Sequence, residues 1–246
     1  MQLIEAQILP DFNYIRNDIT ELTSGMPLYH SILTGIALGD AKLHTAFKRA
    51  NVSAEVGQKA IDELCDIGII SVEKANSHFT SWKDRDIVEN KLSFKSPFLR
   101  FWFAFVSPIF KGIRDGNYSE IKERFANRES EFIQLTFKEL SHEFLKLAFK
   151  ENDPIKQINS AWNNSTEIDI YAKTKDGKII VGTTKYTNQK LKKSTLTQLK
   201  ESAKELGIEA DIFVLISKSG FSKELKSLKG ENLKLYTPKS FKKLVA

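Results

Sequence analysis

The sequence has 246 residues, of which 41% are apolar, and a formal net charge of +6. This apolar content can fill buried cores and excludes the disordered class, while the length suits two small domains. The single cysteine, Cys65, excludes an intramolecular disulfide. No secretory signal is visible, so we expect a cytoplasmic protein. No apolar run approaches the roughly 20 residues of a membrane span, and no Walker A motif provides a P-loop nucleotide site.

The positive charge is concentrated in the C-terminal part. Residues 150–246 hold 19 lysines and 11 acidic residues, an excess of eight positive charges, whereas residues 1–149 carry an excess of two negative charges. Every basic residue after Arg128 is a lysine. Lysine suits phosphate contacts better than bidentate reading of guanine. A nucleic-acid partner would therefore be held by its backbone. The alternative is a merely solubilising, lysine-rich surface.

The N-terminal region, residues 1–94, shows a winged-helix order. Apolar periodicity predicts short helices that are followed by a strand over 69–73, a polar stretch over 76–84 and a returning strand over 91–94. The helices are expected at 11–22, 28–38, 42–50 and 54–66. Three helices followed by a hairpin is the winged helix-turn-helix arrangement, which implies DNA binding through the third helix.

The helix over 54–66, the last of the three before the hairpin, is a poor match to DNA. It carries four acidic residues and one lysine, Lys59. Acidic side chains repel phosphates, so a winged helix used for packing or protein contact is the alternative. Residues 95–128 follow as an aromatic connector, Phe98 to Phe110 having helical spacing typical of a buried helix between two domains. A second short helix is expected at 118–125.

Residues 129–246 are predicted to form an α/β domain with the order α-β-β-β-α-β-α-β-α. A helix over 130–150 precedes strands at 155–159, 166–172 and 178–186. A helix over 195–206, a buried strand over 211–217, a helix over 221–228, a strand over 233–236 and a last helix from Pro238 complete it. The whole chain is thus expected to combine α+β and α/β parts around a mixed sheet.

Three segments carry a resemblance to a known family. They are the run SPFLRFWFAFVSP from Ser96, the preceding winged-helix region, and the strand EID at 167–169. Over residues 28–218 the chain resembles the C-terminal region of archaeal-type AAA ATPases, the domain of unknown function 234. That resemblance implies a winged helix joined to a restriction-endonuclease-like, PD-(D/E)xK domain. The ATPase half of those proteins has no counterpart in this sequence.

A metal-dependent nuclease of this kind needs two or three carboxylates around Mg²⁺ and a lysine near the reacting water. The resemblance assigns the aspartate to Asp169 and the lysine to Lys185. The expected glutamate two residues before that lysine is Thr183, and the acid of the first helix is Lys138. The catalytic set is therefore partly lost.

Neighbouring carboxylates offer a rescue. Glu167 lies two residues before Asp169 on the same strand, and Glu143 lies on the first helix. A site of Glu143, Glu167, Asp169 and Lys185, with Asp169 as metal ligand, would make the chain a Mg²⁺- or Mn²⁺-dependent DNA endonuclease. None of the four histidines has metal-ligand spacing.

Three functions remain open at this point. The first is a DNA-associated protein with an inactive nuclease fold, binding backbone phosphates through exposed lysines. The second is the endonuclease with a migrated carboxylate, and the third is a protein-interaction or regulatory module, with a homodimer or another protein as partner. The predicted nucleic-acid contacts are Lys190, Lys192, Lys193, Lys200 and Lys59.

Overall fold

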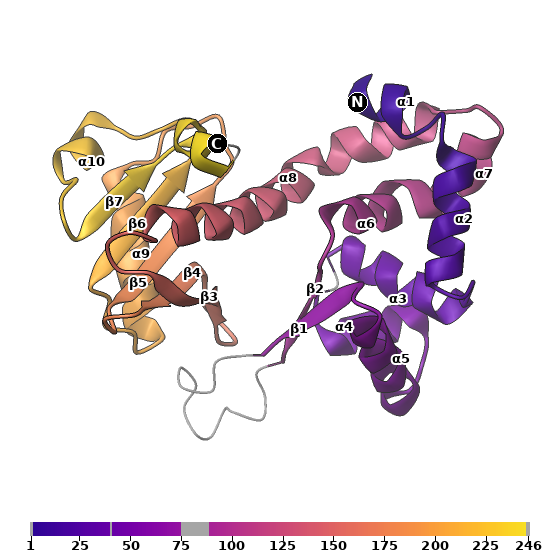
Figure 1. Cartoon of the computed structure of the whole chain (residues 1–246), viewed down its shortest axis with the longest axis horizontal. Helices are drawn as coiled ribbons and strands as arrows, with labels where there is room; N and C mark the ends of the chain where they lie inside the picture. Colours follow the sequence, from indigo (N-terminus) through magenta and orange to yellow (C-terminus); the bar gives the residue numbers. More distant parts are fainter. Residues whose placement is uncertain (1, 40, 75–88, 245–246) are drawn as a thin grey trace. The chain divides into compact units, whose positions relative to one another are not determined.

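The computed structural model describes residues 2–39, 41–74 and 89–244. They divide into two compact units, with the boundary between Glu129 and Ser130. Helices and a five-stranded mixed sheet make the chain a mixed α/β protein (Figure 1). Within the described ranges, none of the helices is both long enough and apolar enough to cross a bilayer. The polar stretch expected over 76–84 lies outside the described residues.

The first unit begins with helices and continues into a hairpin-like pair of strands. The helices are α1 (Gln2–Gln7), α2 (Phe12–Leu22), α3 (Pro27–Ala37), α4 (Leu43–Ala50) and α5 (Ala54–Asp66). Strands β1 (Ile70–Glu73) and β2 (Lys91–Phe94) pair antiparallel. The Ser53 side chain caps α5 by accepting a hydrogen bond from the Val56 amide, as its N-cap position predicts. The elements from 12 to 94 confirm those predicted from periodicity.

The aromatic segment forms the core of the first unit. It runs through α6 (Pro97–Phe101), a π-helical turn η2 (Trp102–Val106), a 3₁₀ turn η3 (Ser107–Ile109) and α7 (Phe110–Arg114). All five residues of η2 are buried, and Trp102 stacks on Phe12 with ring centroids 5.7 Å apart. The predicted burial is confirmed. The segment is not one regular helix, because Pro108 cannot continue an α-helical hydrogen-bond ladder.

Helix α8 (Ser119–Ala148) is a single 30-residue helix. The prediction of two separate helices over 118–125 and 130–150 is therefore wrong. The residues between the two predicted pieces, Ala126 to Glu129, include neither glycine nor proline and favour helix. Nothing local therefore interrupts the backbone hydrogen bonds.

The second unit is built on a five-stranded sheet of order β3-β4-β5-β6-β7. The strands are β3 (Ile155–Trp162), β4 (Glu167–Thr174), β5 (Ile179–Lys185), β6 (Ile212–Ser217) and β7 (Leu233–Tyr236). The first three strands pair antiparallel, and β5, β6 and β7 pair in parallel. Consequently the start of β4 lies at the same end of the sheet as the C-terminal ends of β5 and β6.

Helices cover both faces of this sheet. On one face α8 packs Phe137, Phe144 and Leu145 against Ile170 and Ile180, together with the 3₁₀ helix η4 (Pro238–Leu244) (Figure 1). On the other face, α9 (Lys193–Glu205) and α10 (Lys223–Ser227) pack against a second cluster of buried residues. The predicted order of helices and strands in this part is confirmed.

Candidate nucleic-acid interface

Asp169 lies at the end of the sheet where β4 begins and β5 ends. Its Oδ2 accepts one hydrogen bond from Oγ1 of Thr183, at 2.7 Å, and one from the amide of Thr184, at 2.9 Å. Opposite Asp169, the register of β3 shifts between Asn159 and Ala161. Such bulges re-aim side chains, which accounts for a carboxylate directed at the neighbouring strand.

Thr183 takes the position expected for a catalytic glutamate. Its side chain is buried, and it lies beside Asp169 as the strand pairing predicted. A threonine hydroxyl is neutral, and here it donates a hydrogen bond to the aspartate carboxylate. The carboxylate therefore has protein donors where a nuclease would place a metal ion and a second acid.

Helix α8 contributes a polar stripe that the sequence analysis missed. Nε2 of Gln134 donates to the carbonyl and the hydroxyl of Thr184, at 3.0 and 3.1 Å, and its Oε1 accepts from the Tyr186 amide at 2.7 Å. Nε2 of His142 donates to the Asp169 carbonyl at 2.8 Å. Gln134, Lys138 and His142 are spaced by four residues, so this stripe was present in the sequence as a polar line within an apolar helix.

Lys138 links α8 to the first two strands of the sheet. Its ammonium donates to Oγ of Ser160 at 3.0 Å, and Ser160 donates in turn to the carbonyl of Asp169 at 3.3 Å. The same ammonium lies 3.9 Å from a carboxylate oxygen of Glu167, and its side chain is only 18% exposed. Lys138 thus places a positive charge beside Ser160 and Glu167, with Ser160 linking it to the backbone carbonyl of Asp169.

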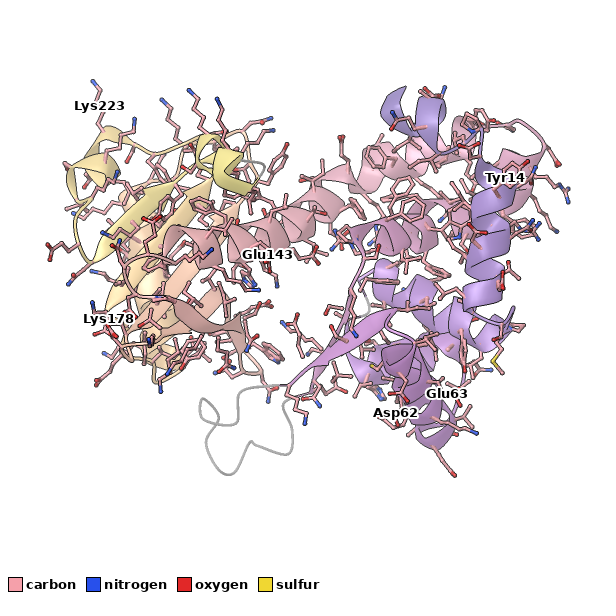
Figure 2. The ribbon with its side chains drawn as sticks, viewed as in Figure 1. Tyr14, Asp62, Glu63, Glu143, Lys178 and Lys223 are labelled. Atoms are coloured by element: carbon pink, nitrogen blue, oxygen red, sulfur yellow. The ribbon has the colours of Figure 1, made fainter. Side chains whose placement is uncertain are left out.

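The rescue carboxylates are both held by lysines. Glu167 faces Lys138, and Glu143 pairs with Lys146 at 2.7 Å on the exposed surface of α8 (Figure 2). In the part of the chain that the structure describes, no three His, Cys, Asp or Glu side chains form a group that could hold a metal ion. Asp169 is brought together with Thr183 and not with a second acid. The oxygen ligands present therefore do not fit Mg²⁺.

Two loops follow β5 and β6 at the same end of the sheet and are hydrogen-bonded to each other. The Leu191 amide donates to the Gly220 carbonyl at 2.9 Å, and the Ser222 amide donates to the Leu191 carbonyl at 2.8 Å. Oγ of Ser219 donates to the Thr187 carbonyl at 2.6 Å. These bonds join residues 186–192 and 218–222 into one platform, named here the loop platform.

The loop platform and its flanking residues are strongly basic. Residues 185–193 and 218–223 contain six lysines and no acidic residue, namely Lys185, Lys190, Lys192, Lys193, Lys218 and Lys223. Lys218 is held in place: its ammonium donates to Oδ1 of Asn188 at 2.9 Å and lies 4.4 Å from the centre of the Tyr186 ring. Lys193 pairs with Glu224 at 3.3 Å. Helix α9 begins here, so its first amides add a partial positive charge.

The other predicted lysines have different surroundings. Lys185, the predicted catalytic lysine, is exposed at the end of β5, and its carbonyl accepts from the Lys218 amide at 3.1 Å. Lys190 and Lys192 are exposed on the loop platform. Lys200 lies about two turns further along α9, with its ammonium 5.4 Å from the Phe213 ring centre. Lys59 is exposed on α5 in the first unit.

The comparisons with known proteins give one match. Residues 102–199 match the family model of the domain of unknown function 234, DUF234, described as archaea bacterial proteins of unknown function. This matched stretch, called here the DUF234 segment, covers 98 of the 246 residues. The DUF234 segment contains Asp169, Thr183 and the first of the two platform loops, whereas Lys218 follows it. Searches of curated proteins and of solved structures gave no significant match.

Proposed function

We propose that this chain binds nucleic acid, in the first instance DNA, through its phosphate backbone and does not cleave it. The observation that carries the proposal is the loop platform with its flanking residues, which hold six lysines and no acid, next to an Asp169 carboxylate whose neighbour is a threonine. Cationic side chains and helix N-termini are the groups that hold phosphates in protein–DNA complexes.

The proposed fold assignments support this reading. In the second unit a helix, three antiparallel strands, a helix and a parallel strand follow one another, which is the order of the PD-(D/E)xK core. In the first unit, α3, α4 and α5 precede the β1–β2 pair, as in a winged helix. We adopt both assignments as part of the proposal.

The lysines argue for binding that tolerates any sequence. An ammonium acts on a phosphate as a point charge, whereas base reading in the major groove relies chiefly on forked donors such as arginine. Residues 130–246 contain no arginine. We therefore expect similar affinities for unrelated duplexes of equal length, and affinity that falls steeply with salt.

The test is a fluorescence anisotropy titration of a labelled duplex with a neutralised platform. Replacing Lys190, Lys192 and Lys218 by glutamine should weaken binding by about tenfold or more, and should make the salt dependence shallower by about one unit per lysine. The matched control replaces three exposed lysines at the other end of the sheet, Lys156, Lys173 and Lys175.

The two triple variants have the same net charge, so they separate a site from a general charge effect. Lys178 and Lys223, at opposite ends of the second unit, mark the two regions compared (Figure 2). A larger loss in the platform variant supports the proposal. Equal losses in both variants, or no binding by the wild type at about 50 mM salt, would contradict it.

A protein-binding role for α5 is the second candidate. This helix presents Asp62 and Glu63 on its surface (Figure 2), and it exposes the apolar side chains of Val56 and Ile67, at 47% and 46%. Glu63 also accepts a hydrogen bond from the Tyr29 hydroxyl. An acidic and partly apolar surface suits a basic protein partner better than DNA. Replacing Lys59 by glutamine should then leave DNA affinity unchanged.

Nuclease activity, the remaining candidate, is tested directly. We expect no cleavage of plasmid in Mg²⁺ or Mn²⁺ by the wild type, by Asp169→Ala or by Lys185→Ala. Cleavage by the wild type that both variants abolish would establish an enzyme with a migrated carboxylate. Equal residual cleavage by all three proteins would indicate a contaminating nuclease.

A further inference from the structure

The polar network around Asp169 contains its own cation. The Lys138 ammonium is 18% exposed and lies between Oγ of Ser160, at 3.0 Å, and the Glu167 carboxylate, at 3.9 Å. Because Ser160 continues the chain of hydrogen bonds to the Asp169 carbonyl, this charge is tied to the same strand as the aspartate. A lysine anchored by two partners on the sheet keeps a defined position.

One oxygen of Asp169 has two hydrogen-bond donors, and the two neighbouring glutamates each lie near a lysine. Oδ2 of Asp169 accepts from Thr183 and Thr184, while Glu167 faces Lys138 and Glu143 pairs with Lys146. A magnesium ion requires oxygen ligands with net negative charge, and a nearby ammonium repels it. The donor set therefore disagrees with the metal that a PD-(D/E)xK fold implies.

We infer that this site binds no divalent metal and that Lys138 supplies the fixed positive charge in its place. The part of the inference that concerns phosphate rests on the proposed function: phosphates on the neighbouring loop platform are neutralised by ammonium groups alone. Nucleic-acid binding is accordingly independent of Mg²⁺, unlike binding by a nuclease whose metal bridges protein and phosphate.

The first experiment measures metal binding without nucleic acid, as the melting temperature of the full chain in EDTA and in excess Mn²⁺. The wild type should show no rise. Lys138→Glu combined with Thr183→Glu replaces the cation and the hydroxyl by carboxylates beside Asp169 and Glu167. Its melting temperature should rise by about 5 °C with Mn²⁺, because a ligand that binds only the folded state stabilises it.

Lys173→Glu is the control, since it makes the same charge change as Lys138→Glu at an exposed position of β4 near the far end of the strand. It should show no Mn²⁺ response. A Mn²⁺-dependent rise in the wild type that Asp169→Asn removes would overturn the inference. A folded double variant without any Mn²⁺ response would show that Lys138 and Thr183 are not what excludes the metal, and would also overturn it. If the double variant does not fold, the wild-type measurement still decides.

The second experiment compares duplex affinity in EDTA and in Mg²⁺ at equal ionic strength. We expect equal or slightly weaker binding in Mg²⁺, since the ion competes for the phosphates. An affinity gain of about fivefold or more in Mg²⁺, beyond what competition permits, would overturn the inference and leave the proposed function standing. Failure to bind under both conditions would overturn the proposed function, while the melting experiment would still test the metal inference.

Discussion

The hydroxyl of Thr183 donates a 2.7 Å hydrogen bond to Oδ2 of Asp169. The neighbouring strand thereby supplies a hydrogen-bond donor to this carboxylate oxygen. The Thr184 amide, 2.9 Å from the same oxygen, is its second hydrogen-bond donor. In this account the aspartate anchors the start of β4 to the end of β5 and takes no part in chemistry.

The Thr183–Asp169 bond should contribute measurably to stability. Thr183→Val keeps the side-chain shape and removes the donor, so it should lower the free energy of unfolding by about 1.5–3 kcal/mol, the range for a hydrogen bond to a charged group. Urea denaturation measures this loss. Thr183→Ser, which keeps the hydroxyl, should lose clearly less. A smaller loss for valine than for serine would indicate that the methyl packing matters more than the bond.

Gln134 should be among the most sensitive polar positions in the second unit. Its amide makes three hydrogen bonds to the backbone and side chains at the end of β5, so Gln134→Leu removes all three and leaves buried partners unsatisfied. We expect a loss of about 2–3 kcal/mol in unfolding free energy. Gln198→Leu, at an exposed position of α9, is the control and should change stability by less than about 0.5 kcal/mol. Similar losses at both positions would contradict the structure.

Gly182 is required where β5 passes β6 closely. A Cβ built at this position would lie 2.7 Å from the carbonyl oxygen of Val214, a backbone atom in the adjacent strand. Gly182→Ala should therefore destabilise the protein by about 1–3 kcal/mol through overpacking. Gly230→Ala meets no atom within 4 Å and should be near neutral. Thermal denaturation of both variants checks the difference, and a neutral Gly182→Ala would refute the close approach.

Asp153 should make part of the stability depend on acid pH. Burial alone raises the pKa of Asp153. Hydrogen bonds from the Asp176 amide and the Thr174 hydroxyl lower the pKa, and together with nearby charge they outweigh burial, so that the net pKa falls below the ordinary 3.8. A lowered folded pKa means that the contribution is present above about pH 4 and is lost as pH falls through the folded pKa. Asp153→Asn should thus melt lower than wild type at pH 7, with a gap that narrows below about pH 4. A gap that stays constant across this range would be inconsistent with the prediction.

The local features of the sequence were sufficient to predict most of the secondary structure. Strand-like segments on either side of a predicted hairpin turn identified β4 and β5, and the family resemblance assigned Thr183 to the place of the glutamate that accompanies Asp169. The predicted break in α8 was wrong, since no helix-breaking residue lies between the two predicted helices.

The missed parts of the site depend on contacts that are distant in sequence. Lys138 contacts Ser160 and Glu167, and Gln134 contacts residues about 50 positions away. The loop platform joins residues near 190 to residues near 220 through the parallel pairing of β5 with β6. No pattern in a single segment reports such contacts. Lys218 was consequently not predicted as a phosphate contact, although Lys190, Lys192 and Lys193 were.

The most direct test of the central claim is the salt dependence of duplex binding in EDTA. If ammonium groups of the loop platform hold the phosphates, the logarithm of the association constant should fall linearly with the logarithm of salt concentration, with a slope of about −4 or steeper. Unrelated duplexes of equal length should give the same line. A slope near zero, or binding that appears only when Mg²⁺ is added, would contradict the account.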